Sequence, residues 1–162
     1  MKLDRGVVGK ALEVSLPLII ADAATSIIWI IDAFFVGMLG YMELAGLGAA
    51  SYLLWLVIII SNLIYMGAFV IAGQARGARK DDLAVRVLRE SLGAAAALGV
   101  AVAAATYMLA PQALQRLSGD AWPYAWEYTL AWLPGIPIYY VNLVYDAGLR
   151  SFGMTRPIMV SV

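Results

Sequence analysis

The sequence predicts an all-α integral membrane protein with four transmembrane helices and the start of a fifth. Composition is the first observation behind this fold class: 63% of the 162 residues are hydrophobic and 14% are charged, against roughly 45–50% and about 25% in ordinary soluble domains. The second observation is that the apolar residues form blocks long enough to cross a bilayer, which takes about 20 helical residues. A water-soluble fold could not bury this much apolar surface.

Four apolar blocks give the predicted helices in chain order. They cover residues 14–39, 44–75, 85–110 and 124–149, and a fifth block starts near residue 157. As a helix the second block would measure roughly 45 Å, so it must tilt or project beyond a hydrocarbon core of about 30 Å. Residues 111–123 contain proline, glycine and aspartate, which predicts a loop. Pro134 and Pro137 predict a kink in the fourth block.

The basic residues predict the orientation of the chain. They gather before the first block, between the second and third blocks, and at the end of the fourth, whereas Arg116 lies on the opposite side. By the positive-inside rule we predict a cytoplasmic N-terminus, and we expect a multi-pass protein of the plasma membrane. The first block is too long for the apolar core of a signal peptide, which predicts a retained helix. An aromatic belt is expected at the outer interface: Trp122, Tyr124, Trp126 and Tyr128.

Several function classes are not supported by the sequence. The chain has no cysteine and no histidine, which excludes disulfides, thiol chemistry, zinc sites built on those ligands and an imidazole proton relay. Eleven basic residues balance eleven acidic ones, so net charge points to no nucleic-acid partner. A phosphate-binding loop of the G-x-x-x-x-G-K-[ST] type is absent. We therefore predict neither an enzyme nor a nucleotide-driven pump, and no cofactor.

The first block carries two carboxylates inside the membrane. An ionised carboxylate near the bilayer centre costs several kcal/mol, so such groups usually face a bundle interior or a wet cavity. At about 100° per residue, one face of the helix combines Asp22, Thr25, Trp29 and Asp32. This stripe predicts a cavity, with Asp22 nearer the cytoplasmic interface.

Asp32 is the predicted ion-coupling residue. It follows Pro17 by 15 residues, roughly 22 Å along the helix axis, which places it in the outer half of the membrane. Desolvation favours the neutral acid, so the group can take up and release a proton, and Na⁺ could occupy the same oxygens instead. The alternative is a hydrogen-bonded aspartate that only ties helices together.

Other residues are weaker candidates. Asn62 in the second block and Asn142 in the fourth could line the cavity, although hydrogen bonding between helices explains either one equally well. Asp146 precedes Arg150 by four residues, which predicts a structural ion pair. Pro17 could act as a hinge because proline removes a backbone donor, or it could simply occupy the first turn of a helix.

Five motifs follow one another along the chain: Leu16-Pro17, the run from Asp32 to Gly40, the run from Leu44 to Gly48, the run from Gly73 to Arg79, and the run from Gly148 to Gly153 with Arg156-Pro157. In this order and spacing, the first four resemble the opening of the multidrug and toxic compound extrusion (MATE) transporters, and the last is similar to the segment that closes that family's fourth helix. The resemblance covers nearly the whole chain.

The resemblance implies twelve helices in two six-helix lobes, alternating access, and export of organic cations or drugs in exchange for H⁺ or Na⁺. Within that scheme Asp32 matches the aspartate that binds the coupling ion, and Pro17 matches a proline at which the first helix bends. Residues 1–162 then form an incomplete N-terminal lobe. We expect its partners to be the lipid bilayer, the organic cation, and the remaining helices of the transporter or other copies of the chain.

Three other readings stay open. A small four-helix multidrug exchanger also has an essential acid in its first helix, but this chain is longer and its charge asymmetry is too strong for an inverted dimer. A lipid-linked oligosaccharide flippase of the same superfamily should carry arginines in its cavity. A membrane scaffold subunit that does not transport should tolerate replacement of Asp32 by asparagine.

Overall fold

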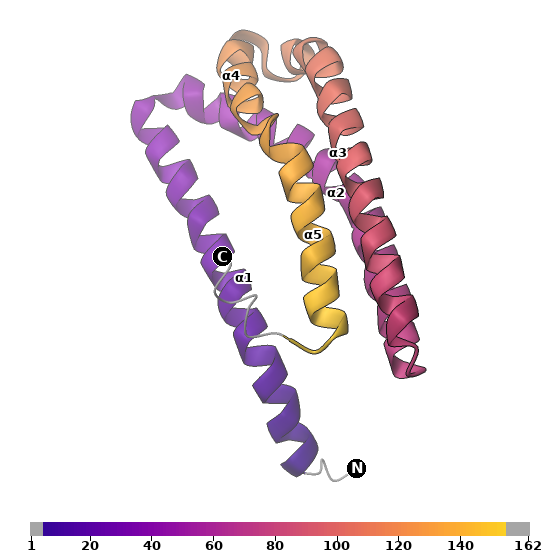
Figure 1. Ribbon diagram of the computed structural model, residues 1–162. Coiled ribbons are helices and arrows are strands. Elements are labelled where there is room, and N and C mark those ends of the chain that lie inside the picture. Colours follow the sequence, from indigo (N-terminus) through magenta and orange to yellow (C-terminus); the bar gives the residue numbers. More distant parts are fainter. Residues whose placement is uncertain (1–4, 155–162) are drawn as a thin grey trace.

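The computed structural model describes the backbone of residues 5–154 and the side chains of residues 15–16, 19–20 and 22–154. This part of the chain is all-helical, as predicted. Its elements are α1 (Arg5–Leu39), α2 (Tyr41–Gly77), α3 (Asp81–Ser118), the short 3-10 helix η1 (Gly119–Ala121), α4 (Trp122–Trp132) and α5 (Gly135–Ser151) (Figure 1). The predicted start of a fifth transmembrane helix near residue 157 lies outside the described residues.

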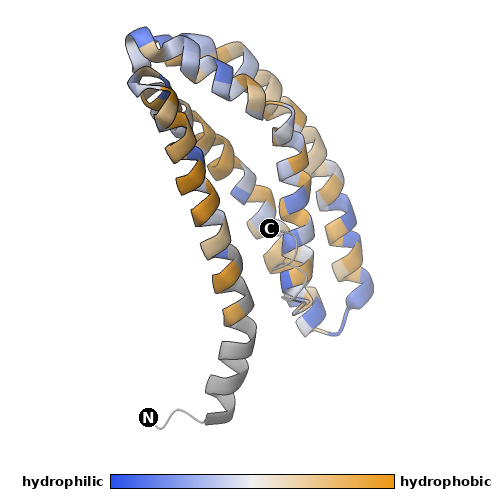
Figure 2. Ribbon diagram, turned by 90° about the vertical axis from the view of Figure 1, so that its left-hand side faces the viewer, coloured by the Kyte–Doolittle hydropathy of each residue, from blue (hydrophilic) through white to orange (hydrophobic). Residues whose placement is uncertain are grey.

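Three stretches of the described chain are long and apolar enough to cross a membrane. They are Asp22–Leu39, Tyr41–Gly77 and Asp81–Trp132. Figure 2 shows that α1 is mainly hydrophobic where it is coloured, and that hydrophilic residues gather at the turn between α2 and α3. We call the end of the molecule at this turn the basic end, because Arg76, Arg79 and Lys80 lie there.

The predicted fourth helix is divided into α4 and α5 by its prolines. Pro134 and Pro137 lack the N–H groups that would bond to the carbonyls of Leu130 and Leu133. Each carbonyl instead accepts a hydrogen bond from the residue three positions later. These bonds run from Leu133 N to Leu130 O at 3.3 Å and from Ile136 N to Leu133 O at 3.2 Å. The kink predicted from sequence is therefore an interruption of the helix, with 11 residues before it and 17 after it.

The loop predicted for residues 111–123 is wrong over most of its length. α3 continues through Pro111 to Ser118, and the connection between α3 and α4 is reduced to the short 3-10 helix η1. A proline inside a helix costs roughly 3 kcal/mol. Ala110 and the fully buried Leu114 pack against α2 and α4, and this burial offsets the cost. The helix ends at Gly119, whose φ of 50° is readily adopted by glycine.

Small residues form most of the core between α2, α3, α4 and α5. Most of the buried apolar residues are alanines. A Cβ added to Gly46 would lie 2.8 Å from the backbone nitrogen of Ala125, and one added to Gly99 would lie 2.7 Å from Cα of Pro137. Lipid tails are as apolar as leucine, so membrane helices associate through such close van der Waals contact.

The C-terminal ends of α2 and α5 are tied together at the basic end. The guanidinium of Arg76 lies 4.3 Å from the centre of the Phe152 ring, and its Nη1 lies 3.5 Å from a carboxylate oxygen of Asp81. A cation above an aromatic ring is attracted to its face. The contact therefore joins two of the sequence motifs, residues 73–79 and 148–153.

α1 stands apart from this bundle. Among the described helices its backbone approaches only α2, and none of the span Asp22–Leu39 is buried. Figure 1 shows α1 on one side of the molecule, separate from α5, and its side chains contact α4 through Asp32 and Trp29. Its side-chain contacts with α4 therefore decide how it is held.

We expect Gly99→Ala to lower the free energy of unfolding by about 1–3 kcal/mol, because the new methyl group must displace the backbone of Pro137. The measurement is unfolding of the protein in mixed micelles with increasing SDS. Gly93→Ala is the matched control, since a Cβ at Gly93 meets no atom within 4 Å and alanine favours the helix by up to about 1 kcal/mol. Equal stability of both variants would contradict the close packing of α3 on α5.

Candidate functional site

A cavity of about 580 Å³ lies where α1 meets the other helices. α1 forms one wall, and α2, α4 and α5 form the rest. We call it the Asp32 cavity. Its polar and aromatic lining residues are Thr25, Trp29, Asp32, Tyr128, Trp132 and Tyr139. The predicted polar stripe of α1 thus faces a cavity through three of its four members.

Asp32 is held by a hydrogen bond from another helix. The hydroxyl of Tyr128, on α4, donates to Oδ2 of Asp32 at 2.5 Å, across 96 positions of the chain. Charge-assisted O–H···O⁻ bonds have lengths of about 2.5–2.7 Å and are roughly twice as strong as neutral ones. The sequence placed Tyr128 in the interfacial aromatic belt, and the structure instead directs its hydroxyl to the carboxylate. This bond joins α1 to α4.

Aromatic rings form the walls beside the carboxylate. Trp29 of α1 stacks on Trp132 of α4, with 6.1 Å between ring centroids and 20° between ring planes. Tyr139 lines the same cavity from α5. Aromatic faces attract cations, so the cavity combines one negative group with surfaces that suit a flat or quaternary organic cation.

The remaining predicted site residues lie elsewhere or on the border. Asp22 is exposed and is not part of the lining. Asn62 is exposed and donates from Nδ2 to Ile58 O of its own helix at 3.1 Å. Asn142 is exposed on α5, and neither asparagine lines the Asp32 cavity. The backbone of Pro17 lies within α1, and its side chain is outside the described residues. The hinge and the two asparagines remain predictions.

The predicted ion pair on α5 is confirmed. Nε of Arg150 lies 2.9 Å from Oδ2 of Asp146, with both side chains partly buried. The other oxygen of Asp146 is buried and has no hydrogen-bond partner within the described part of the chain. This pair lies toward the basic end of α5, away from the Asp32 cavity.

Three residues of the site were missed from the sequence as site residues: Tyr128, Trp132 and Tyr139. A signal was available, because Tyr128 and Trp132 are four positions apart and share a helix face. The sequence did not show that this face of α4 contacts α1. No group of three or more acidic, histidine or cysteine residues that could hold a metal ion is found among the described residues.

Comparison with known proteins decides the family. The model of the MatE family matches residues 17–162, which includes every residue of the Asp32 cavity. The chain belongs to the MatE family. The resemblance to MATE transporters is therefore confirmed, and MatE proteins are membrane transporters. No curated protein and no solved structure shows a significant match to the chain.

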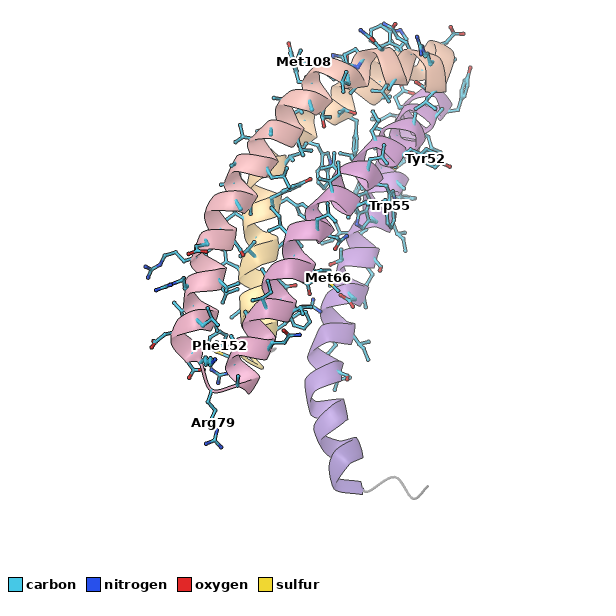
Figure 3. The ribbon with its side chains drawn as sticks, turned by 90° about the vertical axis from the view of Figure 1, so that its right-hand side faces the viewer. Tyr52, Trp55, Met66, Arg79, Met108 and Phe152 are labelled. Atoms are coloured by element: carbon cyan, nitrogen blue, oxygen red, sulfur yellow. The ribbon has the colours of Figure 1, made fainter. Side chains whose placement is uncertain are left out.

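We expect Tyr128→Phe to lower the free energy of unfolding by about 1–2 kcal/mol, since it removes a hydrogen bond to a charged group. The measurement is SDS unfolding in mixed micelles. Tyr52→Phe is the control, because Tyr52 is 75% exposed and its side chain projects outward from α2 in Figure 3. If both phenylalanine variants were as stable as the parent, the bond between Tyr128 and Asp32 would contribute nothing.

Proposed function

We propose that this MatE chain is part of a cation-coupled antiporter that exports organic cations and drugs across the plasma membrane in exchange for H⁺ or Na⁺. The observation that carries the proposal is Asp32, a partly buried carboxylate that faces a cavity with aromatic walls inside a transmembrane helix. Membership of a transporter family supports it.

Competition for Asp32 provides the coupling. As a carboxylate, Asp32 attracts an organic cation in the cavity with about 4 kcal/mol at a separation of 4 Å and an effective dielectric constant of 20. Binding of H⁺ cancels this charge, and binding of Na⁺ offsets it. Removal of 4 kcal/mol weakens the affinity for the cation by nearly a thousandfold. The coupling ion and the drug therefore exclude one another at one residue.

The aromatic walls provide breadth of substrate. Each ring face stabilises a cation by about 0.5–2 kcal/mol without fixing its shape, and a cavity of about 580 Å³ lies within the usual range for drug-sized molecules. Trp29 and Trp132 come from different helices, so a change in the position of α1 alters the width of the site.

The same lining favours an antiporter over the other readings. A flippase for an anionic lipid-linked sugar needs positive groups, and the Asp32 cavity is lined by a carboxylate and no arginine or lysine. A scaffold needs no ionisable group at this depth. In this proposal the N-terminus is cytoplasmic, Pro17 is the hinge of α1, and further helices or copies of the chain complete the transporter.

We expect Asp32→Asn to reduce gradient-driven efflux of ethidium at least tenfold in cells that produce the full-length protein containing this chain. Asparagine has nearly the same shape but cannot carry the charge on which coupling depends. Asp120→Asn is the control, because Asp120 is exposed in η1 and outside the cavity. Unchanged, gradient-dependent efflux in Asp32→Asn would rule out the coupling role.

The coupling ion is identified by two imposed gradients in proteoliposomes. A pH gradient at equal Na⁺ drives uptake of ethidium if the ion is H⁺, and a Na⁺ gradient at equal pH drives it if the ion is Na⁺. The dependence should vanish in Asp32→Asn in either case. A transporter driven by neither gradient would contradict antiport.

A further inference from the structure

Three helices that line the Asp32 cavity each carry a polar residue two turns closer to the basic end. Seven residues make nearly two turns of a helix, so the two members of each pair share a face and lie about 10 Å apart along the axis. The pairs are Trp29 and Asp22 on α1, Ile58 and Tyr65 on α2, and Tyr139 and Asp146 on α5. The three polar residues therefore lie on the helix faces that line the Asp32 cavity, about 10 Å closer to the basic end. We call the space between these three faces the cleft.

Arg150 is a fourth polar residue near these three. It lies one turn beyond Asp146 on α5 and bonds to it through Nε. A guanidinium has five N–H donors in a planar fork, and within the described part of the chain Arg150 has no ionic partner other than Asp146. Asp22 and Tyr65 both lie within electrostatic range of Arg150. The carboxylate of Asp22 is thus an acceptor on the other side of the cleft from Nη1 and Nη2 of Arg150, but it is not in contact with them.

The described helices α1 and α5 are not in backbone contact at this level. Asp22 is exposed, and the backbone of α1 has no close approach to α5 among the described residues. Figure 1 shows α1 and α5 as separate helices at this end of the molecule. Closure of this end therefore needs α1 to approach α5, and that movement brings Asp22 toward Arg150.

We propose that Asp22 and Arg150 are the two halves of a gate that closes the basic end of the cleft below Asp32. Asp146 holds the guanidinium in place through Nε, and α1 closes when Asp22 binds the outer nitrogens. An arginine can hold two carboxylates in this way because its fork presents two edges, whereas a lysine ammonium is a single point charge. With the gate shut, ions reach Asp32 from the opposite end alone. The purpose of the gate rests on the proposed transport function.

The test measures the distance between α1 and α5 in the absence of substrate and of any gradient. The chain has no cysteine, so spin labels can be placed on Ile19→Cys and Tyr145→Cys, two positions that are each 59% exposed. Double electron–electron resonance on the full-length protein in lipid nanodiscs should give a short and a long distance. Asp22→Asn and Arg150→Gln should each raise the ratio of long to short by about tenfold, and the double variant should add little more.

Asp82→Asn is the matched control, because Asp82 is an exposed acid at the basic end on α3, and it should leave the ratio unchanged. Arg150→Lys keeps the charge beside Asp146 but loses the fork, so it should open the gate like Arg150→Gln even if the glutamine variant fails to fold. Additive effects of Asp22→Asn and Arg150→Gln, or an unchanged ratio in Asp22→Asn, would overturn the proposal. Because Asp32 is intact throughout, loss of the coupling role would not affect this result.

Discussion

The structure depends on the cost of a carboxylate inside the hydrocarbon of a membrane. Asp32 has no counter-ion among the described residues within ion-pair distance, so its stabilisation comes from the hydroxyl of Tyr128 and from the cavity that it faces. Both require α1 to lie against α4 at one level. Elsewhere α1 has no such requirement, and among the described helices its backbone approaches only α2. The hydrogen bond from Tyr128 and the stack of Trp29 on Trp132 thus hold α1 against α4 at the level of the cavity.

In contrast to α1, the remaining helices form a closely packed bundle. Alanine and glycine at the interfaces of α2, α3 and α5 bring their backbones together, and the contact between Arg76 and Phe152 ties their basic end. Regions with many buried contacts open at higher free energy than regions with few. Movement of α1 against a fixed bundle is therefore the least costly change of shape, and it alters both the Asp32 cavity and the separation of Asp22 from Arg150.

Patterns within single helices predicted much of this fold, whereas the contacts between helices could not be read from the sequence. Block length and composition predicted an all-helical membrane protein, and spacing along one helix predicted the stripe of Asp32 and the pair of Asp146 and Arg150. The loop at Pro111 was predicted wrongly because burial of Leu114 against two other helices outweighs a local proline cost. Tyr128 was assigned to the interface because its partner lies 96 positions away, beyond any pattern within one helix.

The most direct test of this account is infrared difference spectroscopy of the full-length protein in nanodiscs, between mildly alkaline and acidic buffer. If Asp32 exchanges a proton in the cavity, the spectrum contains a carboxyl C=O band that is absent in Asp32→Asn. Loss of the hydroxyl that donates to Asp32 should shift this band in Tyr128→Phe and leave it in place in Tyr52→Phe. A spectrum that Asp32→Asn does not change, either on this pH step or on a matched change of Na⁺ concentration, would show that Asp32 binds neither coupling ion and would contradict the account.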